Sequence, residues 1–325
     1  MEPAVRALHT DAVIEGVASV VGVAADQLKV LGGFESFVYE TTVGGEPRIV
    51  KATWHGRRTP AQMGAELHFA NHLADGGAPA CRALPLASGQ LIETVPAASG
   101  AFHVCSFEKA PGAVLAREDR TEEHWTRWGA LVGQMNRLSM SYPGPPPPLQ
   151  RATWEEEYGE IGTLLDGQPE LRRAFDRTID GIRSLPRDAD AFGAMHTDLH
   201  SYNVFWTGLE PHVIDFDDML DFWFISDVAI VLYYALMGPV FHEDDRQADY
   251  ERLRELVLGG YATEHTLPDW SIDALPHFME LREQTLLAVI ARSIPESERT
   301  PPWQKFFEEA TDRVRAGRPP LDLQF

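Results

Sequence analysis

The stretch MHTDLHSYNVFWTGLEPHVIDFDD, residues 195–218, brings three oxygen-bearing side chains close together along the chain. Asp198 is followed by Asn203, and Asp215 comes directly after the apolar run 211–214, which is typical of a strand. A carboxylate, an amide and a second carboxylate can together serve a hydroxyl group and one or two Mg²⁺ ions, because Mg²⁺ prefers oxygen ligands. This stretch therefore predicts a metal-dependent site that acts on a hydroxyl group.

Two charged residues upstream fit the same chemistry. Lys51 lies inside PRIVKAT, residues 47–53, whose composition predicts a strand, and a lysine in an apolar strand needs a partner. Glu66 lies in a predicted helix, residues 59–73, that begins with Thr-Pro. ATP phosphates and this glutamate would satisfy Lys51. The alternatives are an edge-strand lysine with its amine in water and a solvated surface glutamate.

A glycine-containing turn precedes Lys51 in LKVLGGFESFVYETT, residues 28–42, which predicts a strand, a turn and a strand. Gly33 would let the backbone approach a phosphate, and Ser36 could add a hydroxyl or a backbone N–H at the tip of the turn. An ordinary hairpin is the alternative, because the stretch has neither a GxGxxG pattern nor a Walker ending.

The pattern changes at EKAPG, residues 108–112, after three predicted short strands at 81–86, 91–95 and 101–107. We expect Phe107, Glu108 and Ala110 to bind adenine there, the last two through backbone C=O and N–H groups. Before this point the sequence predicts about five strands and one long helix.

After it the sequence predicts mostly helices. YPGPPPPL, residues 142–149, is predicted to be a loop rather than a PxxP ligand. A further helix, near the N-terminus, is expected at residues 10–23. The later helices are predicted at 121–139, 154–165, 170–184, 228–237, 252–262, 272–292 and 303–315. These patterns predict an α+β protein of two lobes: residues 1–109 form a nucleotide-binding lobe with a small antiparallel sheet, and residues 110–325 form a larger catalytic and acceptor-binding lobe.

The charge of the chain bears on its partners. The 325 residues have a net charge of −21, which argues against a nucleic-acid ligand, because phosphate backbones select for basic surfaces. Residues 1–109 hold 8 Lys or Arg against 11 Asp or Glu, whereas residues 110–325 hold 20 against 38. The acidic second part would attract a cationic small molecule; ordinary solubility is the alternative explanation.

Composition also predicts the compartment. Two cysteines, Cys81 and Cys105, are too few for a disulfide framework and suit the reducing cytoplasm. The N-terminus has no basic segment followed by an apolar one, so we expect no signal peptide. The most apolar run, residues 228–240, is too short to span a bilayer, which needs about 20 residues, and is expected to be a buried helix.

Other interpretations of residues 195–221 are weaker. His196 and His200 flank Asp198, but they lack the helix and third ligand of a typical zinc site, and His196 is expected to be a structural histidine. The aspartates after residue 214 lack the glycine and glutamate of a calcium loop. We expect Asp217, Asp218 and Asp221 to be solvated, with contact to a cationic acceptor as the alternative.

Taken together, the motifs resemble the aminoglycoside phosphotransferase and choline kinase-like superfamily, which has the protein-kinase fold. HTDLHSYN, residues 196–203, is similar to the catalytic loop HGDLHxxN of that family, and IDFD, residues 214–217, is similar to its metal-binding segment. Thr197 replaces the usual glycine, which we expect to be tolerated if φ stays negative there. Asp227 matches a downstream aspartate that anchors the loop. The turn GFESFVYE looks most like that of homoserine kinase-like and stress-response kinase-like bacterial members.

The resemblance implies an ATP- and Mg²⁺-dependent kinase that acts on a hydroxyl group. Asp198 would accept the acceptor proton, Asn203 and Asp215 would hold Mg²⁺, and Lys51 would hold the ATP phosphates. The expected acceptor is a small molecule such as an amino alcohol, an amino sugar or an aminoglycoside-type antibiotic, with no nucleic acid or membrane as partner. The alternatives are a protein Ser/Thr kinase of the stress-response type, disfavoured because no activation segment ending in APE is evident, and a nucleotide-binding pseudokinase.

Overall fold

The computed structural model describes residues 3–33, 35–237 and 246–325. The chain divides into two compact units. The N-terminal unit comprises Met1–Pro111, Pro143–Arg151 and His212–Asp217, and the helical unit comprises Gly112–Tyr142, Ala152–Pro211 and Asp218–Phe325. The sequence placed the segments 143–151 and 212–217 in the second lobe. The assignment of a nucleotide-binding and an acceptor-binding lobe stays a prediction.

An antiparallel sheet forms the centre of the N-terminal unit. Its strands run in the order β1-β2-β3-β6-β4, and β5 also pairs with β6. The β-branched and aromatic residues of β2 and β3 favour this pleated, half-buried state. The strand bounds are β1 Lys29–Gly32, β2 Ser36–Val43, β3 Glu46–Trp54, β4 Ala83–Leu84, β5 Glu93–Pro96 and β6 Ala101–Glu108.

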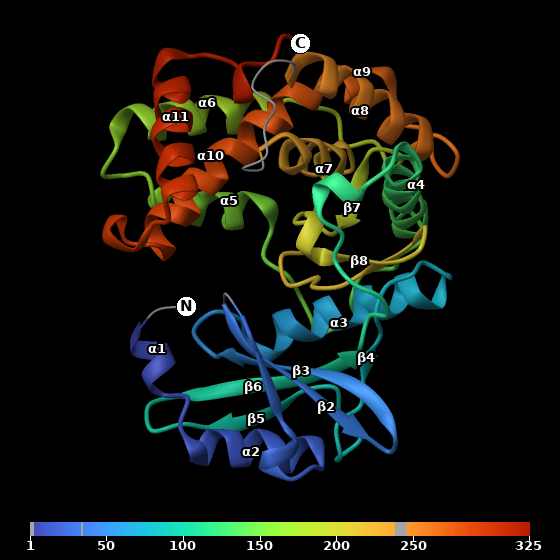
Figure 1. Cartoon of the computed structure of the whole chain (residues 1–325), viewed down its shortest axis with the longest axis vertical. Coiled ribbons are helices and arrows are strands. Elements are labelled where there is room, and N and C mark those ends of the chain that lie inside the picture. Colours follow the sequence, from blue (N-terminus) through green and yellow to red (C-terminus); the bar gives the residue numbers. More distant parts are fainter. Residues whose placement is uncertain (1–2, 34, 238–245) are drawn as a thin grey trace. The chain divides into compact units, whose positions relative to one another are not determined.

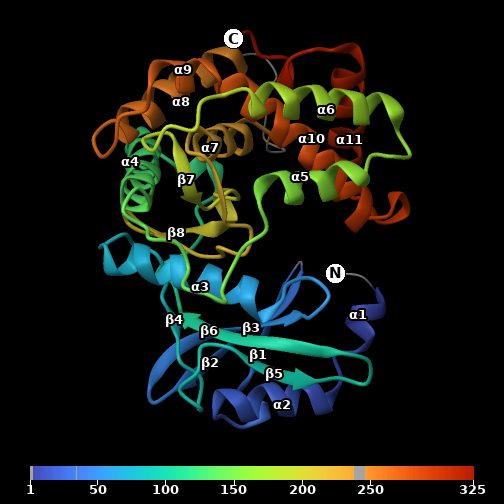
Figure 2. The same ribbon diagram turned by 180° about the vertical axis from the view of Figure 1, so that it is seen from behind.

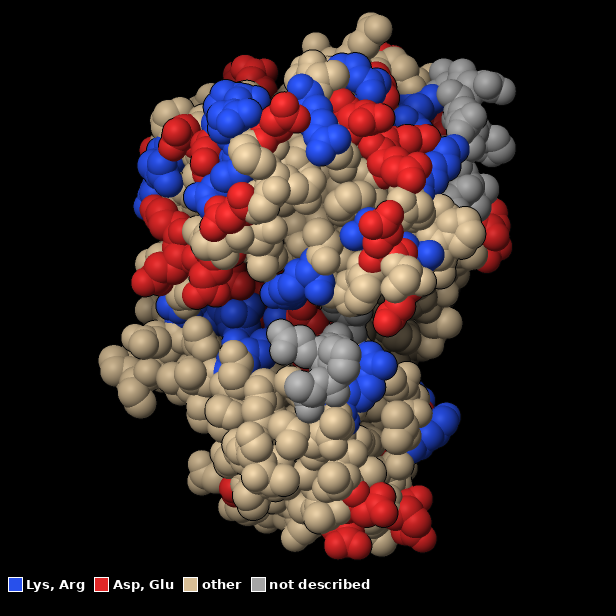
Figure 3. Space-filling model, turned by 90° about the vertical axis from the view of Figure 1, so that its left-hand side faces the viewer, with Lys and Arg blue, Asp and Glu red and all other residues tan. Residues whose placement is uncertain are grey.

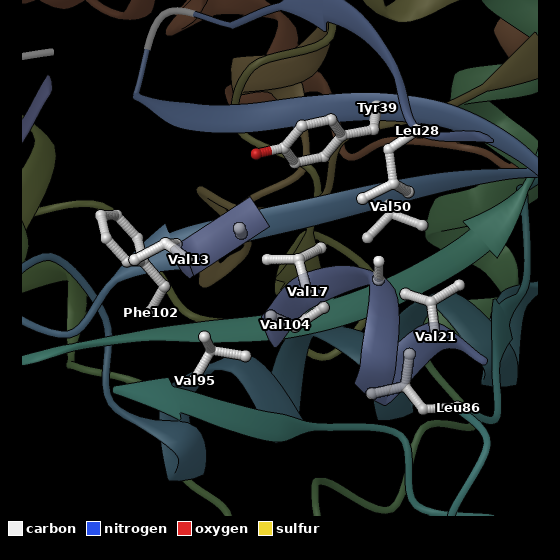
Figure 4. Packing of buried hydrophobic residues seen from close by; sticks show 12 residues of the cluster. Val13, Val17, Val21, Leu28, Tyr39, Val50, Leu86, Val95, Phe102 and Val104 are labelled. Carbon is white, nitrogen blue, oxygen red and sulfur yellow. The ribbon is translucent and has the colours of Figure 1, made fainter. Parts of the chain in front are cut away.

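Two helices cover the opposite faces of this sheet (Figure 1). Helix α2 (Asp11–Val21) packs on one face with a valine stripe that meets Val50, Val104 and other apolar strand residues (Figure 4). Helix α3 (Pro60–Asp75) covers the other face, where Met63 and Leu67 share a cluster with residues of β4 and β6. A short helix, α1 (Pro3–Ala7), was not predicted.

A distant segment completes the N-terminal unit. Val213, in strand β9 (Glu210–Val213), forms a parallel bridge with Ala80. The Val213 N–H donates to Pro79 O at 2.8 Å, and the Cys81 N–H donates to Val213 O at 3.0 Å. Phe216 then packs edge-on against Phe69 of α3, with ring centroids 6.0 Å apart. These contacts attach the segment that carries Asp215 to the N-terminal unit.

The helical unit is built from eight described helices, of which α5, α6, α10 and α11 lie together in Figure 2. Helix α7 is apolar all round and buried almost throughout, as predicted for part of the run 228–240, whose last residues lie outside the described chain. The bounds are α4 Glu122–Ser139, α5 Trp154–Thr163, α6 Pro169–Arg183, α7 Ile225–Met237, α8 Arg246–Tyr261, α9 Asp269–Asp273, α10 Leu275–Ser293 and α11 Pro301–Ala316.

The structure has four short strands in and next to this unit, more than the sequence predicted. Only β9 was predicted; β7 (Phe192–Met195), β8 (Val204–Thr207) and β10 (Leu220–Trp223) were not. β10 pairs antiparallel with β7, so that Leu220 lies opposite Met195. The stretch 195–218 is therefore a loop whose two ends are fastened side by side.

The elements confirm the α+β fold class and most predicted helices. Residues 142–149 contain neither helix nor strand, as predicted. The predicted helix 272–292 is divided into α9 and α10 at Ala274. On the face that Figure 3 shows, acidic and basic side chains are interspersed over the helical unit rather than gathered by sign.

Helices α4 and α8 approach each other through glycines. A Cβ at Gly260 of α8 would overlap the carbonyl oxygen of Thr126 in α4, and a Cβ at Gly129 would overlap the carbonyl oxygen of Val257. The two backbones are therefore close enough that only hydrogen fits between them, and this contact sets their packing.

We predict that Gly260→Ala lowers the free energy of unfolding by about 3 kcal/mol, because the added methyl group must push one backbone away from another. Gly259→Ala is the matched control: a Cβ at that adjacent, exposed position meets no atom within 4 Å. The control should be neutral or up to about 1 kcal/mol stabilising, since alanine favours helix over glycine. Urea unfolding of both variants measures the difference, and equal stabilities would contradict the close packing.

Candidate active site

Strand alternation places Lys51 on the α3 side of the sheet. Its neighbours Val50 and Ala52 point into the core under α2, so the side chain between them points the other way. β3 is an interior strand, and the Lys51 side chain is only 11% exposed, which excludes an edge lysine in water. Its Nζ lies 4.0 Å from Glu66 Oε1 and 2.7 Å from Asp215 Oδ1.

The charges of this cluster depend on one another. Burial raises the pKa of Glu66 to about 7, an effect that Lys51 opposes. Burial also acts to lower the Lys51 pKa, but Asp215, Asp217 and Glu66 outweigh it and hold that pKa well above its ordinary value. Lys51 is therefore a permanent cation among carboxylates.

Asp215 has the backbone conformation of a tight turn. Its φ is +65°, a left-handed value that aspartate tolerates better than most residues. Its side chain is 45% exposed, in contrast to the buried Phe216 beside it. The turn therefore presents the carboxylate at the surface of the N-terminal unit, next to Lys51.

Asp217 corrects the expectation of a solvated aspartate. It is buried, and its Oδ2 accepts hydrogen bonds from Arg57 Nη2 at 2.6 Å and Nε at 3.0 Å. Arg57 also pairs with Glu35 of the glycine turn. Burial acts to raise the Asp217 pKa, but Lys51, Arg57 and two further arginines outweigh it and lower that pKa. Asp221 is exposed and Asp218 is half-buried.

The glycine turn differs in part from the expectation. Ser36 is buried at the start of β2, and its Oγ lies 2.9 Å from Thr53 Oγ1 of β3, so the hydroxyl belongs to the sheet rather than to the tip of the turn. A Cβ at Gly33 would overlap Ser36 O, so glycine is required there. Phe34 lies outside the described residues.

The predicted adenine-binding residues follow the end of β6. Phe107 is nearly buried under α3, and Ala110 is buried just after the strand. The Glu108 N–H donates to Arg82 O at 2.9 Å, so this group is already used. In the described part of the chain the Ala110 N–H has no hydrogen-bond partner. Their roles in binding stay predictions.

In the helical unit, a buried carboxylate holds the loop that contains Asp198. Asp227, in the first turn of α7, is fully buried and accepts hydrogen bonds from the Thr197 N–H at 2.9 Å and the His196 N–H at 3.3 Å. His196 is also buried, and its Nδ1 accepts the Asp198 N–H at 3.2 Å, the structural role predicted for it. Among the described residues no cluster of three or more His, Cys, Asp or Glu could hold a metal, and the zinc interpretation gains no support.

Thr197 was expected to be tolerated if its φ stays negative, and this condition is not met. Its φ is +62°, a conformation that is strained for a β-branched residue. Two contacts hold it there: its N–H binds Asp227, and its hydroxyl donates to the carbonyl oxygen of Asp218. The loop keeps the backbone shape for which glycine is usual, and the Thr197 side chain ties its two ends together.

Asn203 ends a short 3₁₀ turn (Ser201–Asn203) and is oriented by Asp198. Its Nδ2 donates to the carbonyl oxygen of Asp198 at 2.9 Å. The amide nitrogen is thereby committed, and Oδ1 is left as the atom that can bind a cation. An amide oxygen is the kind of hard ligand that a divalent cation such as Mg²⁺ or Ca²⁺ accepts.

Two arginines escaped the sequence analysis. Arg57 pairs with Asp217, and Arg282 of α10 pairs with the carboxylate of Asp198. Each pair joins residues far apart in sequence, so no local pattern in the sequence could predict it.

Within the residues that the structure describes, no helix is long and apolar enough to cross a bilayer.

The fold and these groups define a class of protein. Each unit has residue types that phosphoryl transfer from ATP requires. In the N-terminal unit these are Lys51, Glu66 and Asp215, and in the helical unit they are Asp198 and Asn203. This is the composition of a phosphotransferase with the kinase fold.

Comparison with known proteins defines the family. The profile of the phosphotransferase enzyme family matches residues 26–262. Amicoumacin kinase of Bacillus subtilis (strain 168) is 32% identical over 289 residues, which cover 88% of this chain and 86% of that protein. The chain therefore belongs to the phosphotransferase enzyme family, and it is an enzyme of the kinase type.

Solved structures agree. An amicoumacin kinase in complex with AMP-PNP, Ca²⁺ and Ami superposes with a TM-score of 0.90 at 26% identity, over 98% of this chain and 97% of that one. A microcompartment-associated aminopropanol kinase has a TM-score of 0.74 at 21% identity, over 94% and 95% of the two chains, which shows the shared fold. ATP and a divalent metal are thus implied as cofactors.

We predict that Asp227 makes stability depend on pH. Burial raises its folded-state pKa from 3.8 to about 6. The folded state therefore binds this proton more tightly than the unfolded state, so the contribution of Asp227 to stability is full below about pH 4 and is lost as pH rises through 6. Asp227→Asn has no such proton.

The measurement is urea unfolding of the wild type and Asp227→Asn between pH 4 and pH 7. All other titrating groups are shared and cancel in the difference. The free energy of unfolding of the wild type, relative to the variant, should fall by roughly 2 to 2.5 kcal/mol over this range, because each unit of pKa difference is worth about 1.4 kcal/mol and the unfolded carboxyl group is already partly ionised at pH 4. Parallel pH profiles would show that the carboxylate titrates normally.

Proposed function

We propose that this chain is an ATP- and Mg²⁺-dependent kinase that phosphorylates a hydroxyl group of a small, cationic molecule. The observation that carries the proposal is the contact of Lys51 Nζ with Asp215 Oδ1 at 2.7 Å, between residues 164 positions apart. A strand lysine, its helix glutamate and a metal-binding aspartate are the groups that hold ATP phosphates in kinases.

Each residue has a role in this proposal. Lys51, kept in place by Glu66, holds the α- and β-phosphates. Asn203 Oδ1 and Asp215 hold Mg²⁺, which when bound neutralises charge on the β- and γ-phosphate oxygens. Asp198 orients the acceptor hydroxyl and takes its proton. Backbone groups of Gly33, Ser36, Glu108 and Ala110 bind the remainder of the nucleotide, together with Phe107.

The acceptor is proposed from charge and from kinship. The excess of acidic residues in 110–325 attracts a cationic molecule by its overall field. An amino alcohol, an amino sugar or an aminoglycoside-type antibiotic has this chemistry. The relative that is 32% identical is named for amicoumacin, so that compound is the first candidate acceptor.

The test is ADP production with a panel of acceptors: amicoumacin, aminopropanol, choline, homoserine, several aminoglycosides and a generic protein. We expect turnover with one amino-bearing small molecule. Phosphorylation of the protein alone would favour a protein kinase. Nucleotide binding without turnover of any acceptor would indicate a pseudokinase.

We predict that Asp198→Ala lowers kcat about 1,000-fold without weakening ATP binding, because it removes the group that accepts the proton. Asp190→Asn, an exposed aspartate of the same unit, is the control and should keep wild-type kcat. Steady-state kinetics with the identified acceptor measure both. An Asp198→Ala enzyme as fast as the wild type would refute the assigned role.

We also predict that removal of divalent metal with EDTA abolishes turnover and that Mg²⁺ restores it better than Ca²⁺. Mg²⁺ binds at about 2.0–2.1 Å with strict octahedral geometry, whereas Ca²⁺ takes more ligands at about 2.3–2.6 Å. Titration of each metal into the metal-free enzyme gives the comparison. Equal turnover with both ions would contradict a site selective for Mg²⁺.

A further inference from the structure

The two carboxylate oxygens of Asp198 have different surroundings. Oδ1 accepts a hydrogen bond from Nη2 of Arg282. Oδ2 has His200 Nε2 at 3.4 Å, and in the described part of the chain no other donor lies near it. His200 Nδ1 accepts the Tyr202 N–H at 3.2 Å, so neutral His200 carries its proton on Nε2. Oδ1 is firmly held, and Oδ2 is only loosely contacted.

The pair between Arg282 and Asp198 uses a single nitrogen. Arginine and carboxylate commonly form two parallel hydrogen bonds, which would occupy both oxygens. Here Nη2 donates to Asp198 Oδ1 and also, at 2.6 Å, to the hydroxyl oxygen of Tyr234. An Nη2 group has two protons, so both are used. Tyr234 thus holds the second Nη2 proton and fixes the direction in which this nitrogen meets Oδ1.

The surrounding core fixes this arrangement. The Arg282 side chain is 13% exposed, and its guanidinium carbon lies 4.9 Å from the centre of the Tyr234 ring. Tyr234 belongs to α7 and Arg282 to α10, two helices that pack against each other (Figures 1 and 2). Burial raises the pKa of Tyr234 to about 12, so its hydroxyl remains protonated and neutral.

We propose that Arg282 is a positioning residue for Asp198: it binds Oδ1 through one nitrogen and so leaves Oδ2 to receive the proton of the acceptor hydroxyl. Tyr234 holds the guanidinium in this position. This inference rests on the proposed kinase function. In the transfer step the acceptor oxygen bonds to the γ-phosphorus, the bond from that phosphorus to ADP breaks, and the acceptor proton passes to Oδ2.

Kinetics of four variants test the proposal. Arg282→Met should lower kcat about 100-fold with KM for ATP unchanged, the scale expected when a catalytic group is misplaced. Arg282→Lys should recover part of this loss, because the ammonium restores the charge but not the fixed fork. Tyr234→Phe should lower kcat about tenfold. The double variant Arg282→Met/Tyr234→Phe should be no slower than Arg282→Met, since Tyr234 acts through Arg282.

Arg252→Gln is the matched control. It breaks an arginine–glutamate pair in the same unit, but this pair with Glu122 is exposed, at 63% and 60% of the side chains. Its kcat should equal that of the wild type. Thermal unfolding is followed for every variant, and if Arg282→Met does not fold, Arg282→Lys and Tyr234→Phe decide. The positioning role would be overturned if Tyr234→Phe and Arg282→Met kept the wild-type kcat. It would also be overturned if KM for ATP rose in Arg282→Met by the same factor as kcat fell.

Crystal structures of the wild type and Tyr234→Phe give a second test that needs no acceptor. We expect single contact with Oδ1 in the wild type and a displaced guanidinium, with a changed or lost contact to Asp198, in the variant. A two-pronged pair in the wild type would overturn the inference even if the enzyme is an active kinase. Conversely, the expected geometry in an enzyme that turns over no acceptor would refute the proposed function and leave the orienting contact established.

Discussion

The N–H groups of His196 and Thr197 both donate to the Asp227 carboxylate, which the core of the helical unit encloses completely. A buried carboxylate without partners is costly, and these donors together with the first turn of α7 reduce that cost. If the loop that contains His196 and Thr197 moved away, the buried Asp227 carboxylate would lose these two hydrogen bonds. The position of Asp198 and Asn203, a few residues further on, therefore depends on a residue of α7. The hydrogen bond to Asp227 also helps to offset the conformational strain of the left-handed backbone at Thr197.

Local patterns in the sequence predicted what local physics decides. Alternation along β3 separates Lys51 from its apolar neighbours, and Thr59 caps α3 by accepting the Gln62 N–H, as the Thr-Pro start predicted. Helix α7 was recognisable from its apolar run. The family motifs predicted Asp198, Asn203 and Asp215 as a set, but the chemistry assigned to them rests on the proposed function.

Contacts between distant residues could not be predicted in this way. Asp217 appears in the sequence as one of several aspartates at a surface turn, yet it is buried because Arg57 neutralises it. Arg282 is one arginine on a long helix, and only the packing of α10 on α7 brings it to Asp198. The sign of φ at Thr197 could not be predicted either, since it depends on hydrogen bonds that Thr197 donates to Asp227 and Asp218.

The segment 212–217 belongs to the N-terminal unit, although residues 112–142 and 152–211 of the helical unit precede it in the sequence. During synthesis the chain leaves the ribosome from the N-terminus, and early domains generally begin to fold first. The sheet of β1–β6 must then wait with Lys51 in place until residue 217 emerges, because Asp215 arrives only then. The N-terminal unit can therefore begin to fold early, but its folding is complete only after residues 212–217 have been synthesised. The contact between Lys51 and Asp215 forms only at that stage.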